Sequence, residues 1–146
     1  MNYTKTFITY QQYGELVYKL SDKLMEDKLK FDCIYGPPRG AWPIVTHLSH
    51  QLGIPVKDRL LFDVDDYING EMFDDLYLVV DDIVDFGKTL IETENLLTKF
   101  KVKNVCYATL FYKKRSVFKP DYFVEEISDD LWIVFPWEKF DEEPNR

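Results

Sequence analysis

Apolar residues recur along this chain with spacings typical of helices. Between residues 11 and 30, apolar side chains return every three or four positions and form one face of a predicted helix. Residues 42–52 show the same spacing and are followed by Gly53, a residue that commonly ends helices. Residues 88–100 predict a third helix, with core residues Leu90, Ile91, Leu96 and Leu97.

Short apolar runs between these helices predict strands. The run at residues 76–80 is apolar at every position, which is typical of a strand buried on both faces. Because the runs alternate with helices, they predict an α/β fold with a mainly parallel sheet flanked by helices. Ligands bind such sheets beyond the carboxyl ends of the strands. The other predicted strands are residues 31–35, 56–62 and 104–111, with shorter ones at 122–124 and 132–135.

Size and charge limit the possible functions. At 146 residues the chain is expected to form a single domain, 1–146. A formal charge of −8 opposes binding to nucleic acid. No uncharged apolar run approaches the length of a membrane span, and residues 1–10 do not form an apolar signal segment. We therefore expect a cytoplasmic protein with neither a nucleic-acid nor a membrane partner.

The cysteines and histidines do not predict a metal site. Cys33 and Cys106 are far apart and lack metal-ligand spacing, so we expect reduced core thiols. His47 and His50 lie three positions apart, and without a third ligand nearby in the sequence we interpret them as structural or surface residues.

Residues 78–90 join an apolar strand to a helix through three acids and a glycine. Asp81 and Asp82 follow the strand, where carboxylates can bind ribose hydroxyls or hydrated magnesium; the alternative is a solvated strand end. Residues 85–89 would present backbone N–H groups at a helix N-terminus, where anions bind. Asp85 is also placed to cap that helix. Together these features predict a sugar-phosphate site.

Two further segments carry candidate chemistry. Residues 36–40 read Gly-Pro-Pro-Arg-Gly, which is either an ordinary turn or a phosphate-binding loop in which the planar guanidinium of Arg39 pairs with phosphate oxygens. Residues 121–138 predict two short strands with buried aromatic side chains, and Trp132 is either a core residue or a ligand-stacking one.

The three segments resemble type I phosphoribosyltransferases in their order and spacing. Residues 78–90 resemble the motif that binds phosphoribosyl pyrophosphate (PRPP), except that Phe86 replaces a threonine. Residues 121–138 are similar to the end of bacterial xanthine-guanine phosphoribosyltransferases, with Asp-Tyr, Trp-Ile and Pro-Trp-acid in succession. The resemblance covers residues 31–138 and implies the type I fold, with a small C-terminal hood over the sheet.

The resemblance also implies a role for each matching residue. Arg39 and Gly40 would bind pyrophosphate, with the Pro38–Arg39 peptide in the cis form. Asp81 and Asp82 would hold the ribose hydroxyls and contact Mg²⁺ through water. The purine would meet Lys113, or alternatively Lys114, at its O6 atom, stack on Trp132 and contact the backbone of Ile133. Asp85 would act as the general base, and the 5-phosphate would lie on Asp85, Phe86, Gly87, Lys88 and Thr89.

By resemblance, the expected activity is transfer of the phosphoribosyl group of PRPP to guanine, xanthine or hypoxanthine, with Mg²⁺ as cofactor and release of pyrophosphate by a homo-oligomer. The alternative is a non-enzymatic domain that binds PRPP or a nucleotide and has a regulatory or interaction role. Phe86 favours this alternative, as does the acidic segment 63–75, which is short for a loop that closes over an active site. We interpret the acids of that segment as a solvated loop face.

Overall fold

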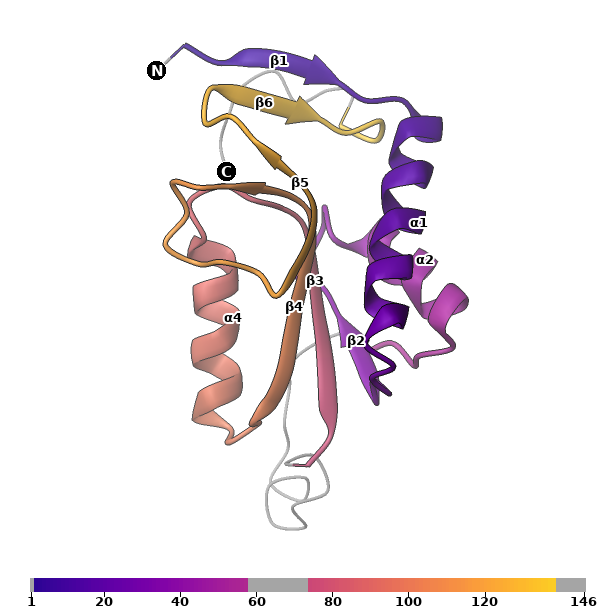
Figure 1. Ribbon diagram of the computed structural model, residues 1–146. Coiled ribbons are helices and arrows are strands. Elements are labelled where there is room, and N and C mark those ends of the chain that lie inside the picture. The colour runs from indigo at the N-terminus through magenta and orange to yellow at the C-terminus, as the bar shows by residue number, and fades with distance from the viewer. Residues whose placement is uncertain (1, 58–73, 139–146) are drawn as a thin grey trace.

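The computed structural model describes residues 2–57 and 74–138 as a parallel sheet between two helical layers. Helices α1 and α2 cover one face of the sheet and α4 covers the other (Figure 1). The strand order is β2-β3-β4-β5, and each neighbouring pair is parallel. The elements are α1 (Tyr10–Glu26), β2 (Cys33–Tyr35), α2 (Trp42–Leu52), β3 (Leu76–Val84), α4 (Lys88–Lys99), β4 (Asn104–Lys113) and β5 (Tyr122–Ile127). The predicted α/β fold is confirmed.

Strand β3 divides the core in two, because successive side chains on a strand point to opposite faces. Leu78 and Val80 pack with residues of α1 and α2, whereas Tyr77 and Val79 pack with residues of α4. All four side chains are buried, as the apolar run predicted. The central position of β3 places its carboxyl end between the two helical layers.

A second, two-stranded sheet lies above the carboxyl ends of the main sheet. It pairs β1 (Thr4–Phe7) with β6 (Leu131–Val134) in parallel, so that Lys5 is opposite Trp132 (Figure 1). No strand was predicted at residues 4–7, because this run mixes threonine and lysine and lacks the apolar pattern of a buried strand; most of its side chains are exposed. Pairing with β6 orders the run.

Two helix boundaries differ from the prediction for local reasons. Helix α1 begins earlier, because Thr9 and Gln12 form a capping box at its start. It also ends four residues before the predicted residue 30, since Lys28 adopts a left-handed backbone conformation with φ 53°. The predicted helix over residues 42–52 matches α2, which ends at left-handed Gly53.

Strands β3 and β4 are longer than predicted. Strand β3 does not end at Val80 but continues through Val84, with Asp81 opposite Thr109 of β4. Polar residues extend it because their backbones still pair with the buried β4. Strand β4 likewise continues beyond the predicted residue 111 and ends at Lys113. Of the predicted strand at 56–62, Val56 forms an isolated bridge to Ile34; residues 58–62, and residues 63–73 of the acidic segment, lie outside the described residues.

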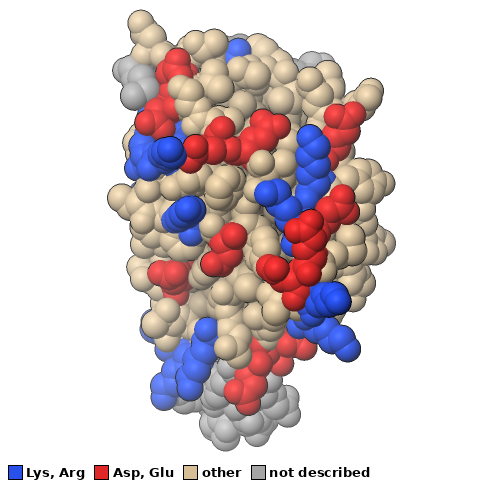
Figure 2. Space-filling view, in the orientation of Figure 1, with Lys and Arg blue, Asp and Glu red and all other residues tan. Residues whose placement is uncertain are grey.

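Acidic and basic side chains alternate over the face shown in Figure 2. Although the net charge of the chain is −8, neither acidic nor basic side chains form a continuous patch on that face. Among the described helices, none has the length and apolar character that a membrane crossing requires.

Candidate functional site

One cavity of about 1060 Å³ opens beyond the carboxyl ends of the central strands. Residues 37–40 line one side of it, residues 81–90 line another, and Trp132 and Trp137 come from the C-terminal part of the chain. The three segments singled out from the sequence therefore meet at one place. All of the chain's three tryptophans line this cavity, the third being Trp42.

The loop before α2 fits closely against its neighbours. A Cβ at Gly36 would lie 2.5 Å from Val45 Cγ2, so the turn requires glycine there. The Pro38–Arg39 peptide is cis, as expected. Arg39 is exposed and lines the cavity, so its guanidinium is accessible to a ligand.

Asp81 and Asp82 both line the cavity from within β3. Each carboxylate accepts a hydrogen bond through Oδ1 from the next backbone N–H: Asp82 N to Asp81 at 2.8 Å, and Ile83 N to Asp82 at 2.7 Å. Asp82 is 7% exposed, and its Oδ2 faces Gly40. The pair is therefore held in place by its own strand and is not a freely solvated strand end.

The two carboxylates provide the hard oxygen ligands that suit Mg²⁺. Within residues 2–57 and 74–138, no group of three or more His, Cys, Asp and Glu is arranged to hold a metal ion alone. Two carboxylates on a cavity wall fit an ion that takes its remaining ligands from water and substrate phosphates.

The loop between β3 and α4 is shaped by Gly87. Its φ is 90°, and a Cβ there would lie 2.5 Å from Ser116 Oγ and 2.8 Å from Phe118 Cβ. Gly87 is also the N-cap of α4, which has no side-chain cap. The expectation that Asp85 caps this helix is wrong, because the N-cap is Gly87, two residues later, and the Asp85 carboxylate instead pairs with Lys113 and Arg115.

Two cations hold Asp85, which is 8% exposed. Lys113 Nζ donates to Oδ2 at 3.3 Å, and its own side chain is fully buried. Arg115 donates to Oδ1 through Nε at 2.7 Å and also through Nη2. Lys113 makes a further hydrogen bond to the Asp129 carbonyl at 3.2 Å. Both oxygens of this carboxylate are thus engaged.

Burial and pairing act in opposite directions on the two cations. Burial lowers the pKa of Lys113, and the neighbouring Asp85 carboxylate offsets this only in part. For Arg115 burial also disfavours the charge, but hydrogen bonds to Asp85 and Tyr3 outweigh it and raise its pKa. Arg115 therefore stays protonated, whereas Lys113 is the easier of the two to neutralise.

The residues predicted to bind the purine differ in whether they line the cavity. Trp132 lines the cavity at 5% exposure, and its ring centroid lies 5.7 Å from that of Tyr3. Ile133 is buried and is not among the cavity-lining residues. Lys113 lies behind the lining, bonded to Asp85, whereas the alternative Lys114 is 78% exposed and pairs with Glu126. The structure therefore connects Lys113, and not Lys114, to the site.

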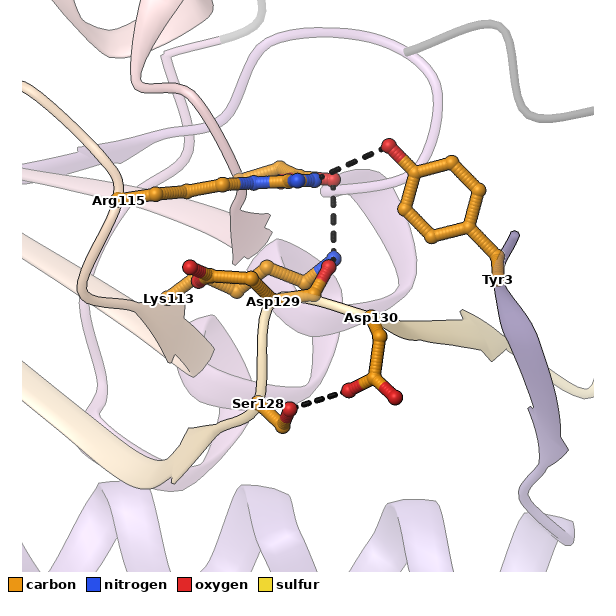
Figure 3. A network of polar contacts seen from close by, with 7 residues as sticks. Tyr3, Lys113, Arg115, Ser128, Asp129 and Asp130 are labelled. Atoms are coloured by element: carbon orange, nitrogen blue, oxygen red, sulfur yellow. Dashed lines mark hydrogen bonds and ion pairs between the residues drawn. The ribbon is translucent and has the colours of Figure 1, made fainter. Parts of the chain in front are cut away.

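Sequence reasoning missed Arg115 and Tyr3. Arg115 Nη2 donates to the Tyr3 hydroxyl at 3.3 Å (Figure 3), and the Arg115 guanidinium carbon lies 4.0 Å from the centroid of the Phe86 ring. The available signal for Arg115 was its place two residues after Lys113, in a basic run at the end of a strand. No local pattern marks Tyr3, because its role depends on the pairing of β1 with β6.

Comparison with known proteins places this geometry in a family. A family model described as "Phosphoribosyl transferase domain" matches residues 74–141. The xanthine-guanine phosphoribosyltransferase of Idiomarina loihiensis is 32% identical over 114 residues, which cover 68% of this chain and 66% of that protein. The match to the corresponding enzyme of Desulfotalea psychrophila spans 36% of its length, at 39% identity over 62 residues. The chain thus matches only part of these curated relatives.

Solved structures match over nearly the whole chain. The purine phosphoribosyltransferase from Pyrococcus horikoshii is 33% identical, with a TM-score of 0.77, and the match covers 97% of this chain and 99% of that one. A hypothetical protein from Neisseria gonorrhoeae with bound ppGpp has the same TM-score at 22% identity, covering 97% and 92% of the two chains. At that identity the second match shows a shared fold.

Proposed function

The chain belongs to the phosphoribosyltransferase family, and we propose that it transfers the phosphoribosyl group of PRPP to a 6-oxopurine with release of pyrophosphate. The observation that supports this most is that Arg39, the Asp81–Asp82 pair, the loop 85–89 and Trp132 line the same cavity. A sugar phosphate and an aromatic base fit these groups side by side.

Each group has a task in the proposed reaction. The first N–H groups of α4 have no partner within the helix and, with the hydroxyl of Thr89, would bind the 5-phosphate. Arg39 would hold the departing pyrophosphate, because its planar guanidinium pairs with two phosphate oxygens. Asp81 and Asp82 would orient the ribose. Through water the same two carboxylates would also contact Mg²⁺, which would supply positive charge against the phosphates of the substrate.

The reacting ribose carbon would gain positive charge as pyrophosphate leaves, so catalysis depends on positioning and electrostatic stabilisation. Trp132 would stack on the purine, and Asp85 would accept the proton that the base loses. Both oxygens of the Asp85 carboxylate already accept hydrogen bonds, one from Lys113 and one from Arg115. A proton from the base must therefore compete with one of these donors for a carboxylate oxygen.

A coupled assay with PRPP, Mg²⁺ and each of guanine, xanthine and hypoxanthine tests the proposal. Asp85→Asn should lower kcat about a hundredfold or more while PRPP binding changes little. Asp22→Asn is the matched control, because Asp22 is exposed on α1 and away from the cavity. Absence of turnover with all three bases contradicts the proposal.

The contacts of Asp85 also favour a second candidate function, nucleotide binding without transfer. Both oxygens of the proposed base are occupied, and Phe86 stands where a hydroxyl would meet the phosphate. The fold is shared with a protein solved with bound ppGpp. Calorimetric titration with ppGpp and with a nucleoside monophosphate separates the candidates: binding of either, without turnover of PRPP, favours this second one.

A further inference from the structure

Arg115 contacts three residues at or beside the site, namely Asp85, Tyr3 and Phe86. Two of its nitrogens donate to Oδ1 of Asp85, one of them also donates to the Tyr3 hydroxyl, and the guanidinium face lies on the Phe86 ring. Its side chain is 12% exposed, so these contacts form largely away from water, where charge-assisted hydrogen bonds are strong.

The backbone around Arg115 is attached to the same loop. Val117 N donates to the Phe86 carbonyl at 3.2 Å, and Ser116 and Phe118 occupy the space beside Gly87. Ser116 N in turn donates to the Lys113 carbonyl at 3.0 Å. The turn after β4 and the loop before α4 are therefore joined by backbone and side-chain contacts at successive positions, and Arg115 is not a loosely held surface residue.

The two oxygens of the Asp85 carboxylate accept different hydrogen bonds. Oδ1 accepts two hydrogen bonds from Arg115, the one from Nε at 2.7 Å. Oδ2 accepts the longer 3.3 Å contact from Lys113, whose pKa burial lowers. A donor from a ligand displaces the weaker and longer contact more easily. Of the two contacts, the one that Lys113 makes at Oδ2 is therefore the easier for a ligand to replace.

We propose that Arg115 is a positioning residue that fixes Oδ1 of Asp85, with its guanidinium held by Phe86 and Tyr3, so that Asp85 presents Oδ2 to the purine base. This inference rests on the proposed transferase function. It assigns Phe86 a task as well: the ring supports Arg115 at a position where a small hydroxyl side chain has no face for the guanidinium to lie on.

Kinetics of three variants test this role. Arg115→Ala removes every side-chain contact, and Arg115→Gln keeps the first two methylenes and an amide donor but removes the charge and shortens the side chain. We expect both to lower kcat about tenfold or more, because small displacements of a catalytic group are costly, with KM for PRPP within about threefold of wild type. Lys119→Ala is the matched control from the same connection, since Lys119 is exposed and does not line the cavity, and it should leave both constants unchanged.

Each other outcome counts against the inference. A wild-type kcat in folded Arg115→Gln overturns it. A parallel loss of kcat, of affinity for both substrates and of melting temperature in Arg115→Gln makes Arg115 merely structural, and also overturns it. If Arg115→Ala does not fold, Arg115→Gln alone decides. Absence of turnover in the wild type is a separate result, which removes the proposed function and this inference with it.

Discussion

Gly40 and Asp82 are in contact, because a Cβ built at Gly40 would lie 2.5 Å from Asp82 Oδ2. One residue belongs to the loop before α2 and the other to β3, and both line the cavity. The loop proposed to bind pyrophosphate and the acid proposed to bind ribose therefore fit together only without a side chain at position 40.

Gly40→Ala should weaken PRPP binding, because the added methyl group must displace the Asp82 carboxylate. Overpacking of this kind costs about 1 to 3 kcal/mol. Calorimetric titration with PRPP and Mg²⁺ measures the effect. The control is Gly14→Ala, where the same methyl group meets nothing within 4 Å on α1 and should stabilise the helix by about 0.5 to 1 kcal/mol. Unchanged PRPP affinity in Gly40→Ala would show that Asp82 moves without loss.

Lys113→Met should alter the pH dependence of stability. Burial lowers the pKa of Lys113 below its ordinary 10.5, so between the lowered value and 10.5 the unfolded chain binds more protons than the folded protein. The free energy of unfolding of the wild type, relative to Lys113→Met, should therefore rise as pH increases through that range and stay level below it. Urea unfolding from pH 7 to 10.5 measures this difference, and a difference that falls with pH contradicts the assignment.

Tyr13→Phe should stabilise the protein by about 1 kcal/mol, because the Tyr13 hydroxyl is buried without a hydrogen-bond partner among the described residues. Burial also raises the pKa of Tyr13 above its ordinary 10.0, so the wild type should lose stability relative to the variant as pH rises above 10. Thermal and urea unfolding check both effects. A less stable variant would mean that the hydroxyl has a partner after all.

Phe86→Thr should lower stability by about 0.5 to 1 kcal/mol, since the Arg115 guanidinium loses the ring on which it lies. A threonine hydroxyl in a phosphate-binding loop would otherwise tighten PRPP binding, but loosening of Arg115 and Asp85 should leave the affinity flat or weaker. Phe86→Leu is the control that keeps an apolar side chain without the aromatic face. Tighter PRPP binding at an unchanged melting temperature would show that the contact with Arg115 has no energetic weight.

Trp132→Ala should weaken binding of the purine base or nucleotide by about 1 to 3 kcal/mol and leave PRPP affinity nearly unchanged, if Trp132 stacks on the base. Because Trp132 is only 5% exposed, truncation also removes core packing, and circular dichroism must show a folded variant. Trp132→Phe keeps an aromatic face and serves as the second variant. Equal losses for base and PRPP would make Trp132 a packing residue.

The sequence by itself determined the alternation of strands and helices and the position of the loops that follow β2 and β3. Both properties depend on local periodicity, and in a parallel sheet the carboxyl ends of neighbouring strands meet at one edge. The sequence also predicted the cis peptide before Arg39, through the family resemblance. The neighbourhood of residues 37–40 and 81–89 could thus be predicted from the strand ends, and that of Trp132 only through the family resemblance.

The tertiary structure alone decided how Asp85 is used. Its carboxylate does not cap the helix as expected, because it pairs with Lys113 at the carboxyl end of β4 and with Arg115 in the turn that follows. The tertiary structure likewise pairs β1 with β6 and brings Tyr3 to Arg115. These contacts join residues that are far apart along the chain. A carboxylate needs cationic partners only when it is removed from water, and this desolvation arises only when the core forms around it. Local sequence patterns show a basic run at residues 113–115 but do not show which acid it contacts.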